Sequence, residues 1–199
     1  MIDLKEARYT LTKSKEIQKI LRSKDGEEFF INSSDEDVIL LMQFYSSSSY
    51  SKVIEKRFAR SYRIDLVPPS ENRGDLTTNQ KYYEFKLSGK KIPSWRHCRP
   101  YQNLDGYIFA CHDDVKFKYY YMDADVAKKY ILEQGTFTQG TNDVSSQNLY
   151  AEYDFTYRPY FENYAYGIED FEKLFNRPAR FPFKNNDFDS DLFDPSENA

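Results

Sequence analysis

The chain has 199 residues, of which 30% are charged and 40% hydrophobic, and its formal net charge is −4. These values fit a single soluble globular domain with a core of its own. The sequence has no run of the roughly eighteen apolar residues that a membrane-spanning helix needs, and its opening residues lack a secretory signal pattern. Two cysteines are too few for a disulfide scaffold. We therefore expect a cytoplasmic protein with no membrane partner.

The N-terminal part is predicted to be mainly helical, because apolar residues recur at helical spacing. Serines and Asp35 precede the second apolar run and are typical N-cap residues. The expected elements, in chain order, are a helix over 3–23, a turn over 24–26, a short strand over 28–31, a buried helix over 38–42 and a helix over 50–62.

Residues 81–88 alternate between polar and apolar side chains and are predicted to form a strand. Successive side chains of a strand point to opposite faces of the sheet. Glu84 and Lys86 therefore share one face, and Phe85 points the other way, into a core.

A second, shorter strand is predicted just before this one, over residues 74–78. Asn79 and Gln80 separate the two strands and are suited to a tight turn. A hairpin of this kind brings the carboxylates of Asp75 and Glu84 together at one edge of a sheet.

The second half of the chain is predicted to mix strands and helices. Pro100 makes one of these helices awkward, because proline removes a backbone donor and bends a helix. The expected elements are a loop over 89–93, a helix from Ser94 to about Leu104 or a shorter one beginning after Cys98 or Arg99, strands over 107–111 and 116–122, a helix over 124–133, a polar loop over 135–147 and a short helix over 168–175.

These elements predict one domain over 1–184, with an N-terminal helical part (1–62), a core (63–134) and a C-terminal elaboration (135–184). Residues 185–199 form an acidic tail with five acids and no base. Between Lys52 and Lys118, by contrast, fourteen basic residues outnumber eight acidic ones, a local balance of +6. Proteins bind DNA largely by neutralising phosphates, so this excess favours a nucleic-acid partner, although a solvated face has the same composition.

Asp75, Glu84 and Lys86 are the candidate catalytic residues. Carboxylate oxygens hold hard cations such as Mg²⁺, and a neighbouring ammonium can position or deprotonate a water. Composition alone produces about one Glu-any-Lys triplet in a chain like this one. The alternative is therefore that Glu84 and Lys86 form only a surface ion pair.

The order of elements from Glu55 to Tyr121 resembles the PD-(D/E)xK nuclease superfamily, which includes type II restriction endonucleases. Gly74-Asp75 stands in place of the Pro-Asp often seen there. The run Arg-Pro-Tyr-Gln-Asn-Leu-Asp-Gly-Tyr-Ile-Phe is similar to the helix and strand that follow the catalytic lysine in this family. The resemblance implies an α/β (α+β) fold with a restriction-endonuclease-like core, a mixed central sheet flanked by helices.

The resemblance also implies roles for individual residues. Asp75 and Glu84, with the backbone carbonyl of Phe85 as a further ligand, are expected to bind one or two Mg²⁺, and Lys86 to orient or activate the attacking water. A helix before the sheet often adds a glutamate in this family, which matches Glu55 by order, although a solvated helix glutamate fits equally well. Hydrolysis is expected to leave a 5′-phosphate.

The implied function is cleavage of a specific double-stranded DNA sequence by a homodimeric restriction enzyme. Two symmetry-related active sites are needed to cut both strands of a palindrome. The alternatives are a repair or phage-defence nuclease without sequence specificity, and a non-catalytic module that binds nucleic acid or protein. Candidate DNA contacts are Arg73, Lys90, Lys91, Arg96 and Arg99, and Gln102 is a candidate for positioning water or Lys86.

The only two histidines each adjoin a cysteine, as His97-Cys98 and Cys111-His112. Zinc ligands are usually separated by two or more residues so that both can turn toward one metal. Adjacent residues on a strand point apart, so this spacing does not favour zinc. Cys98 with His112 as nucleophile and base has no better support.

Overall fold

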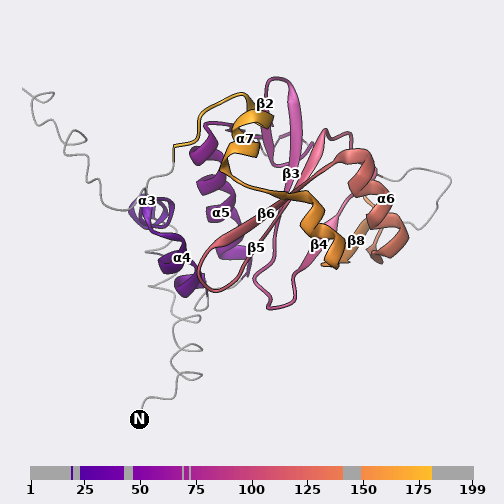
Figure 1. Cartoon of the computed structure of the whole chain (residues 1–199), viewed down its shortest axis with the longest axis horizontal. Coiled ribbons are helices and arrows are strands. Elements are labelled where there is room, and N and C mark those ends of the chain that lie inside the picture. Colours follow the sequence, from indigo (N-terminus) through magenta and orange to yellow (C-terminus); the bar gives the residue numbers. More distant parts are fainter. Residues whose placement is uncertain are drawn as a thin grey trace, which may run out of the picture.

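The computed structural model describes Lys19 and residues 23–42, 47–68, 70, 71, 73–140 and 149–180 (Figure 1). The predicted helix over 3–23 lies outside these residues, apart from Lys19 and Ser23, and so does the acidic tail over 185–199. No helix within the described ranges has the length and apolar composition needed to cross a membrane.

Along the described part of the chain, three helices are followed by six strands and then by a mixture of helices and strands. The helices are α3 (Lys24–Asn32), α4 (Asp35–Met42), α5 (Ser47–Tyr62), α6 (Ala124–Gln134) and α7 (Ile168–Phe175), with a 3₁₀ helix η1 (Pro159–Tyr164). The strands are β1 (Asp65–Leu66), β2 (Leu76–Thr78), β3 (Lys81–Leu87), β4 (Ser94–Cys98), β5 (Gly106–His112), β6 (Phe117–Asp123), β7 (Thr136–Gln139), β8 (Glu152–Thr156) and β9 (Ala165–Tyr166).

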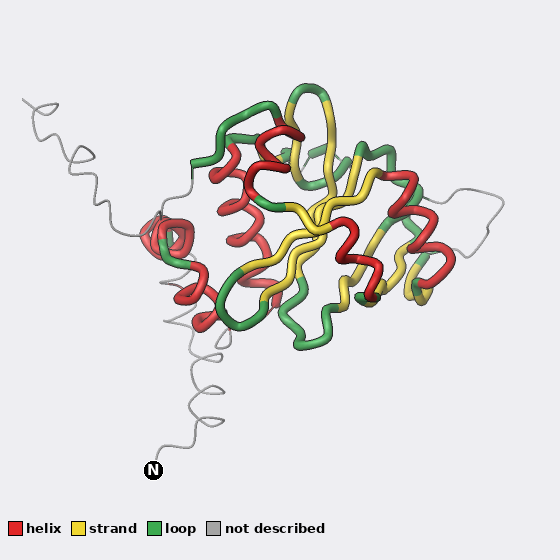
Figure 2. Tube along the Cα trace, in the orientation of Figure 1, coloured by secondary structure: helices red, strands yellow, loops and turns green. Residues whose placement is uncertain are grey.

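The central sheet has six strands in the order β1-β2-β3-β5-β6-β9. The β3–β5 pair is parallel, and the other neighbouring pairs are antiparallel. A second sheet of three antiparallel strands has the order β4-β8-β7. Figure 2 shows the strands in yellow with red helices on both sides. The predicted mixed α/β architecture, a mixed central sheet flanked by helices, is confirmed.

Strand β5 supplies side chains to two cores, one on each face of the central sheet. Ile108 and Ala110 pack in the core that includes α5 and α7. Tyr107 and Phe109 pack in the core that includes α6, β4 and β8. In Figure 1, α5 and α7 lie on one side of the sheet and α6, β4 and β8 on the other. This alternation follows from the period of two along a strand.

Strand β3 has the same alternation but carries charges on one face. Tyr83 and Phe85 pack in the α5 core, with the ring centroids of Phe58 and Phe85 5.3 Å apart. Glu84 and Lys86 therefore face the side on which the three-stranded sheet lies. The predicted division of β3 into a core face and a charged face is confirmed.

The predicted hairpin between β2 and β3 is also confirmed. Leu76 pairs with Tyr83 and Thr78 with Lys81. Asn79 and Gln80 form the turn with φ of 51° and 63°. Positive φ at both positions is what a two-residue hairpin turn of type I′ requires, because its twist matches that of the strands.

The predicted turn and strand over 24–31 are wrong, because this segment belongs to α3. Ser23 caps the helix by accepting a hydrogen bond from the Gly26 amide at 3.2 Å. Glu28 then accepts two bonds from Arg60 of α5, at 2.8 and 2.7 Å. An N-cap with a tertiary partner outweighs the turn preference of an Asp-Gly pair.

The predicted helix over 94–104 is wrong as well, and so is the shorter helix after Arg99. Residues 94–98 form β4, which pairs with β8. Trp95 is fully buried and donates from its indole nitrogen to the carbonyl of Ala110 at 2.9 Å. A tight turn follows at Pro100, with the Gln102 amide bonded to the Arg99 carbonyl at 3.2 Å. Pairing with a distant strand decides this segment, and Pro100 prevents a helical continuation.

The loop predicted over 135–147 is partly a strand, because β7 pairs with β8. Residues 141–148 lie outside the described part of the chain. The predictions of α4, α5, β5, β6, α6 and α7 are confirmed to within a few residues at their ends.

Candidate functional site

The end of the β2–β3 hairpin holds Asp75 against β3. Gly74 has φ +68°, and a Cβ at this position would lie 2.8 Å from the Tyr83 carbonyl oxygen. Only glycine allows so close an approach of the two backbones. The Asp75 amide donates to the same carbonyl at 2.9 Å, and the Phe85 amide donates to Asp75 Oδ2 at 2.9 Å. The Asp75 carboxylate is thereby fixed beside β3.

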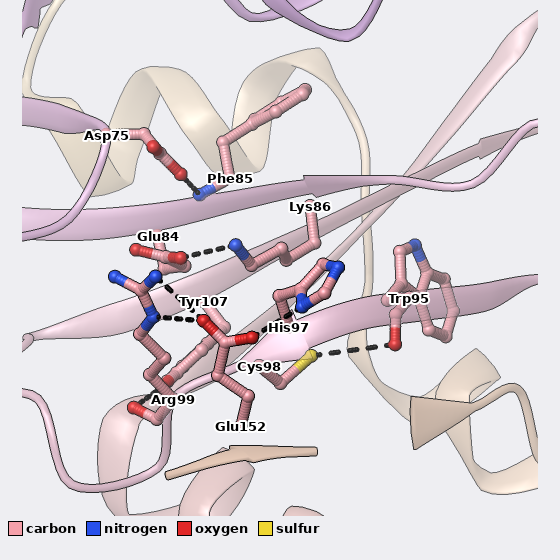
Figure 3. Close-up of polar contacts among 10 residues, drawn as sticks. All are labelled: Asp75, Glu84, Phe85, Lys86, Trp95, His97, Cys98, Arg99, Tyr107 and Glu152. Carbon is pink, nitrogen blue, oxygen red and sulfur yellow. Dashed lines mark hydrogen bonds and ion pairs between the residues drawn. The ribbon is translucent and has the colours of Figure 1, made fainter. Parts of the chain in front are cut away.

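Glu84 and Lys86 form a buried ion pair on the charged face of β3 (Figure 3). Lys86 Nζ lies 2.5 Å from Glu84 Oε1, and the side chains are 19% and 6% exposed, respectively. Removing one partner of a buried pair costs about 3–5 kcal/mol, because the other charge is left without compensation. Replacing either partner alone is therefore expected to destabilise the fold.

Burial and like charge oppose ionisation of the neighbouring carboxyl groups. Burial, with the charge of Glu84, raises the pKa of Asp75 to about 6. Burial, with the charges of Asp75 and Glu84, raises the pKa of Glu55 on α5 to about 8. Burial lowers the pKa of Lys86, but Glu84 and Asp75 outweigh it and raise that pKa overall. We call Glu55, Asp75, Glu84 and Lys86 the carboxylate–lysine cluster.

The backbone carbonyl of Phe85 lies on the same edge of β3 as Asp75. The amide of Phe85 points to Asp75, and the amide and carbonyl of one strand residue share a side. The β2–β3 register ends at Leu76 and Tyr83, so this carbonyl lies beyond the paired stretch. This edge of β3 therefore offers oxygen donors of two kinds, the carboxylates of Asp75 and Glu84 and the carbonyl of Phe85.

This donor set fits a hard divalent cation in its chemistry. Carboxylate and carbonyl oxygens are ligands that Mg²⁺ accepts. Burial is the main cause of the raised pKa values of Asp75 and Glu55, the charges of neighbouring carboxylates add to it, and a bound cation would favour the ionised forms. Within the described residues, no three His, Cys, Asp or Glu side chains are already arranged to hold a metal ion.

A second polar cluster lies beside the first and comprises Glu152, His97 and Arg99, which we call the Glu152 cluster (Figure 3). Glu152 is 6% exposed. Its Oε1 accepts from Arg99 Nε at 2.9 Å and from a terminal guanidinium nitrogen at 2.8 Å, and its Oε2 lies 2.5 Å from His97 Nδ1. Burial raises the pKa of Glu152, but the bonds from Arg99 and His97 hold it below its ordinary value.

Among the five predicted DNA contacts, Arg99 acts by its charge on the carboxylate–lysine cluster, where it lowers the pKa of Asp75. Lys90 and Lys91 are exposed in the loop between β3 and β4. Arg96 is exposed on β4, with its Nε 3.6 Å from Asp154 Oδ2.

Arg73 is occupied elsewhere on the surface. Its guanidinium carbon lies 4.1 Å from the centroid of the Tyr82 ring, and its Nε donates to the Asn103 carbonyl at 2.8 Å. The side-chain oxygen of Gln102 is buried and has no hydrogen-bond partner among the described residues. None of the contacts described for Gln102 joins it to Lys86.

Sequence reasoning missed Glu152 and assigned no role to His97. Glu152 is 55 residues from His97 along the chain, and no local pattern marks it. The predicted helix over 94–104 also concealed the strand that places His97 beside β8. Trp95 and Cys98, the apolar positions that this strand buries, lie three residues apart, which is not the period of a strand, so the local sequence pattern does not indicate it.

The comparisons with known proteins do not assign the chain to a family. It matches no protein-family model, and no curated protein matches it in sequence.

Proposed function

We propose that this chain is a Mg²⁺-dependent endodeoxyribonuclease with a restriction-endonuclease-like core. One set of contacts supports the proposal: Asp75 accepts from the Phe85 amide, Glu84 pairs with Lys86 on the same strand, and the charges of Asp75 and Glu84 act on each other and on Glu55 of α5. Two or three carboxylates, a backbone carbonyl and a lysine are the groups that metal-assisted phosphodiester hydrolysis needs.

The proposed roles are those that the resemblance implies for these residues. Asp75, Glu84 and the Phe85 carbonyl would hold Mg²⁺, with Glu55 as a further ligand. Bound Mg²⁺ would make a coordinated water more acidic and offset charge on the scissile phosphate. The raised pKa of Lys86 keeps it protonated in the metal-free protein, so it would orient the attacking water by donating hydrogen bonds. Glu84 Oε1 fixes the ammonium of Lys86 for this task.

The proposed substrate is double-stranded DNA, and the proposed form is a homodimer that cuts a specific sequence. The basic excess between Lys52 and Lys118 supports a polyanionic partner. A non-specific nuclease would use the same chemistry. Discrete fragments from a plasmid would favour the restriction enzyme, and a smear would favour the non-specific enzyme.

The test is digestion of plasmid DNA by the purified chain, with Mg²⁺ or with EDTA. We expect cleavage only with Mg²⁺, and a loss of about a hundredfold or more in Lys86→Met and Asp75→Asn. Methionine keeps the apolar stem of Lys86, and asparagine keeps the shape of Asp75. Lys81→Ala is the matched control, because Lys81 is an exposed lysine on the same strand.

Thermal melts of all variants would separate loss of chemistry from loss of folding. Cleavage that persists in folded Lys86→Met and Asp75→Asn would contradict the proposed active site. A folded wild type that cuts no DNA with any divalent metal would favour a non-catalytic binding module.

A further inference from the structure

The Glu152 cluster is not needed for the metal chemistry proposed above, yet it lies beside that site. Glu152 belongs to β8, and its two donors, His97 and Arg99, follow each other along β4 and the turn after it. In Figure 3 the Arg99 guanidinium lies between the carboxylates of Glu152 and Glu84. The charge of Arg99 also acts on Asp75, which agrees with this view.

Strand β4 is irregular where it presents these donors. The β4–β8 register shifts between Trp95 and Cys98, and both of these side chains are buried. A regular strand would place Trp95 and His97 on the same face. The irregularity instead turns His97 out, with a left-handed backbone at φ 57° that a non-glycine residue adopts only at a cost. Bulges of this kind often re-aim a side chain beside a functional site.

Arg99 retains binding capacity after its bonds to Glu152. A guanidinium has five N–H donors, and Glu152 engages Nε and one terminal nitrogen. The other terminal nitrogen has no hydrogen-bond partner among the residues that the structure describes. The Arg99 side chain is 34% exposed and that of His97 is 58% exposed, whereas Glu152 is buried. The cluster thus holds the accessible Arg99 and His97 side chains on one fixed carboxylate. Arg99 is a donor in every state, and His97 can donate from Nε2 when both of its ring nitrogens carry a proton.

Phosphate is the ligand that this arrangement suits. A phosphodiester that approaches Asp75 and Glu84 meets negative charge and needs positive groups in addition to a metal. The planar fork of arginine matches phosphate oxygens, and a carboxylate behind it fixes its orientation. We propose that Arg99 and His97 form a clamp on a backbone phosphate of the DNA at the cleavage site, with Glu152 as their positioning residue. This inference rests on the proposed function.

A purely structural role is the competing explanation, since the same bonds tie β4 to β8. That role predicts lower stability in variants of Glu152 and Arg99, with no specific effect on DNA binding. The salt dependence of binding separates the two, because each phosphate contact contributes to its slope.

The experiment is fluorescence anisotropy with a short fluorescein-labelled DNA duplex in EDTA, at several KCl concentrations. We expect Arg99→Ala to weaken binding about tenfold and to reduce the salt slope by about one. Lys129→Ala is the charge-matched control: Lys129 is exposed on α6, and we expect a change below about twofold. Glu152→Gln keeps one oxygen that can accept from Arg99 but cannot accept from His97. We therefore expect it to lose less DNA affinity than Arg99→Ala.

The double variant Glu152→Gln/Arg99→Ala separates an effect on DNA binding from an effect on stability. Arg99→Ala alone leaves the Glu152 charge buried, and adding Glu152→Gln should restore the melting temperature. If Glu152 acts through Arg99, the double variant binds DNA no more weakly than Arg99→Ala and does not regain wild-type affinity.

The clamp would be overturned if folded Arg99→Ala or the double variant bound DNA with the affinity and the salt dependence of the wild type. If the wild type cuts DNA and these variants change only the melting temperature, the clamp fails and the proposed function stands. If the wild type neither binds nor cuts DNA, both fail.

Discussion

The ionisation of Glu55 couples the site to the stability of the whole chain. Its pKa is raised from 4.5 to about 8, first by burial and then by the charges of Asp75 and Glu84. A raised carboxyl pKa means that the folded state retains a proton that the unfolded state releases. The contribution of Glu55 to stability is therefore fully present below pH 4.5 and is lost as the pH rises toward 8.

We expect Glu55→Gln to become progressively more stable than the wild type as the pH rises from about 5 to about 8 in EDTA. Glutamine resembles the protonated acid and does not ionise. The gain should approach roughly 1.4 kcal/mol for each pH unit within this window and level off above it. Melting temperatures of both proteins across this pH range measure the difference.

Glu133→Gln on the surface of α6 is the control for this prediction, because Glu133 is exposed. Its difference from the wild type should be small at every pH. If the melting temperatures of Glu55→Gln and the wild type differed by the same amount from pH 5 to pH 8, the pKa of Glu55 would not be raised by burial and neighbouring charge.

At the scale of single elements, the β2–β3 hairpin decides where Asp75 lies. Gly74 is the residue that lets β2 approach β3, because a Cβ there would lie 2.8 Å from the Tyr83 carbonyl oxygen and 3.0 Å from Leu104 Cδ2. Both the left-handed backbone and the contact disfavour any other residue.

We expect Gly74→Ala to destabilise the fold by about 1–3 kcal/mol and to reduce cleavage about a hundredfold by displacing Asp75. Gly167→Ala is the control, since φ there is −87° and the nearest atom to a new Cβ is Asp170 Oδ2 at 3.6 Å. That change should cost less than about 1 kcal/mol and leave cleavage unaltered. Equal effects of the two substitutions on cleavage would argue against a positional role for Gly74.

The elements also show which parts of the site could be predicted from the sequence. Asp75, Glu84 and Lys86 of the carboxylate–lysine cluster were predictable because strand period and turn chemistry are local and the three residues come from one stretch of chain. Glu55 lies on α5 and was expected only from the order of elements in the resemblance. The Glu152 cluster was not, because the pairing of β4 with β8 joins distant segments and overrides the local preference of 94–98. Burial of Trp95 favours that pairing, and the spacing of apolar residues around Trp95 does not indicate it.

At the scale of the whole molecule, the two cores make the central sheet a rigid support for the site. Strands β5 and β6 carry apolar side chains on both faces of the sheet. Strand β3 carries them on one face and has Glu84 and Lys86 on the other. The three-stranded sheet then brings Arg99 and Glu152 next to this charged face (Figure 3). The site therefore lies between two sheets, whose relative position the packing of Trp95 and Phe109 fixes at a ring-centroid distance of 5.0 Å.

The described part of the chain contains one carboxylate–lysine cluster, which under the proposed function would cut one DNA strand. If the proposed homodimer cuts both strands, linear plasmid should form at high protein concentration, and nicked circles should accumulate on dilution below the dimer dissociation constant. Mixed dimers of wild type and Lys86→Met, isolated by two affinity tags, should nick the plasmid and linearise it slowly. The wild-type homodimer carried through the same isolation is the control. Linear product that forms in strict proportion to the chain concentration, with no excess of nicks in mixed dimers, would mean that one chain makes both cuts and that no partner subunit is needed.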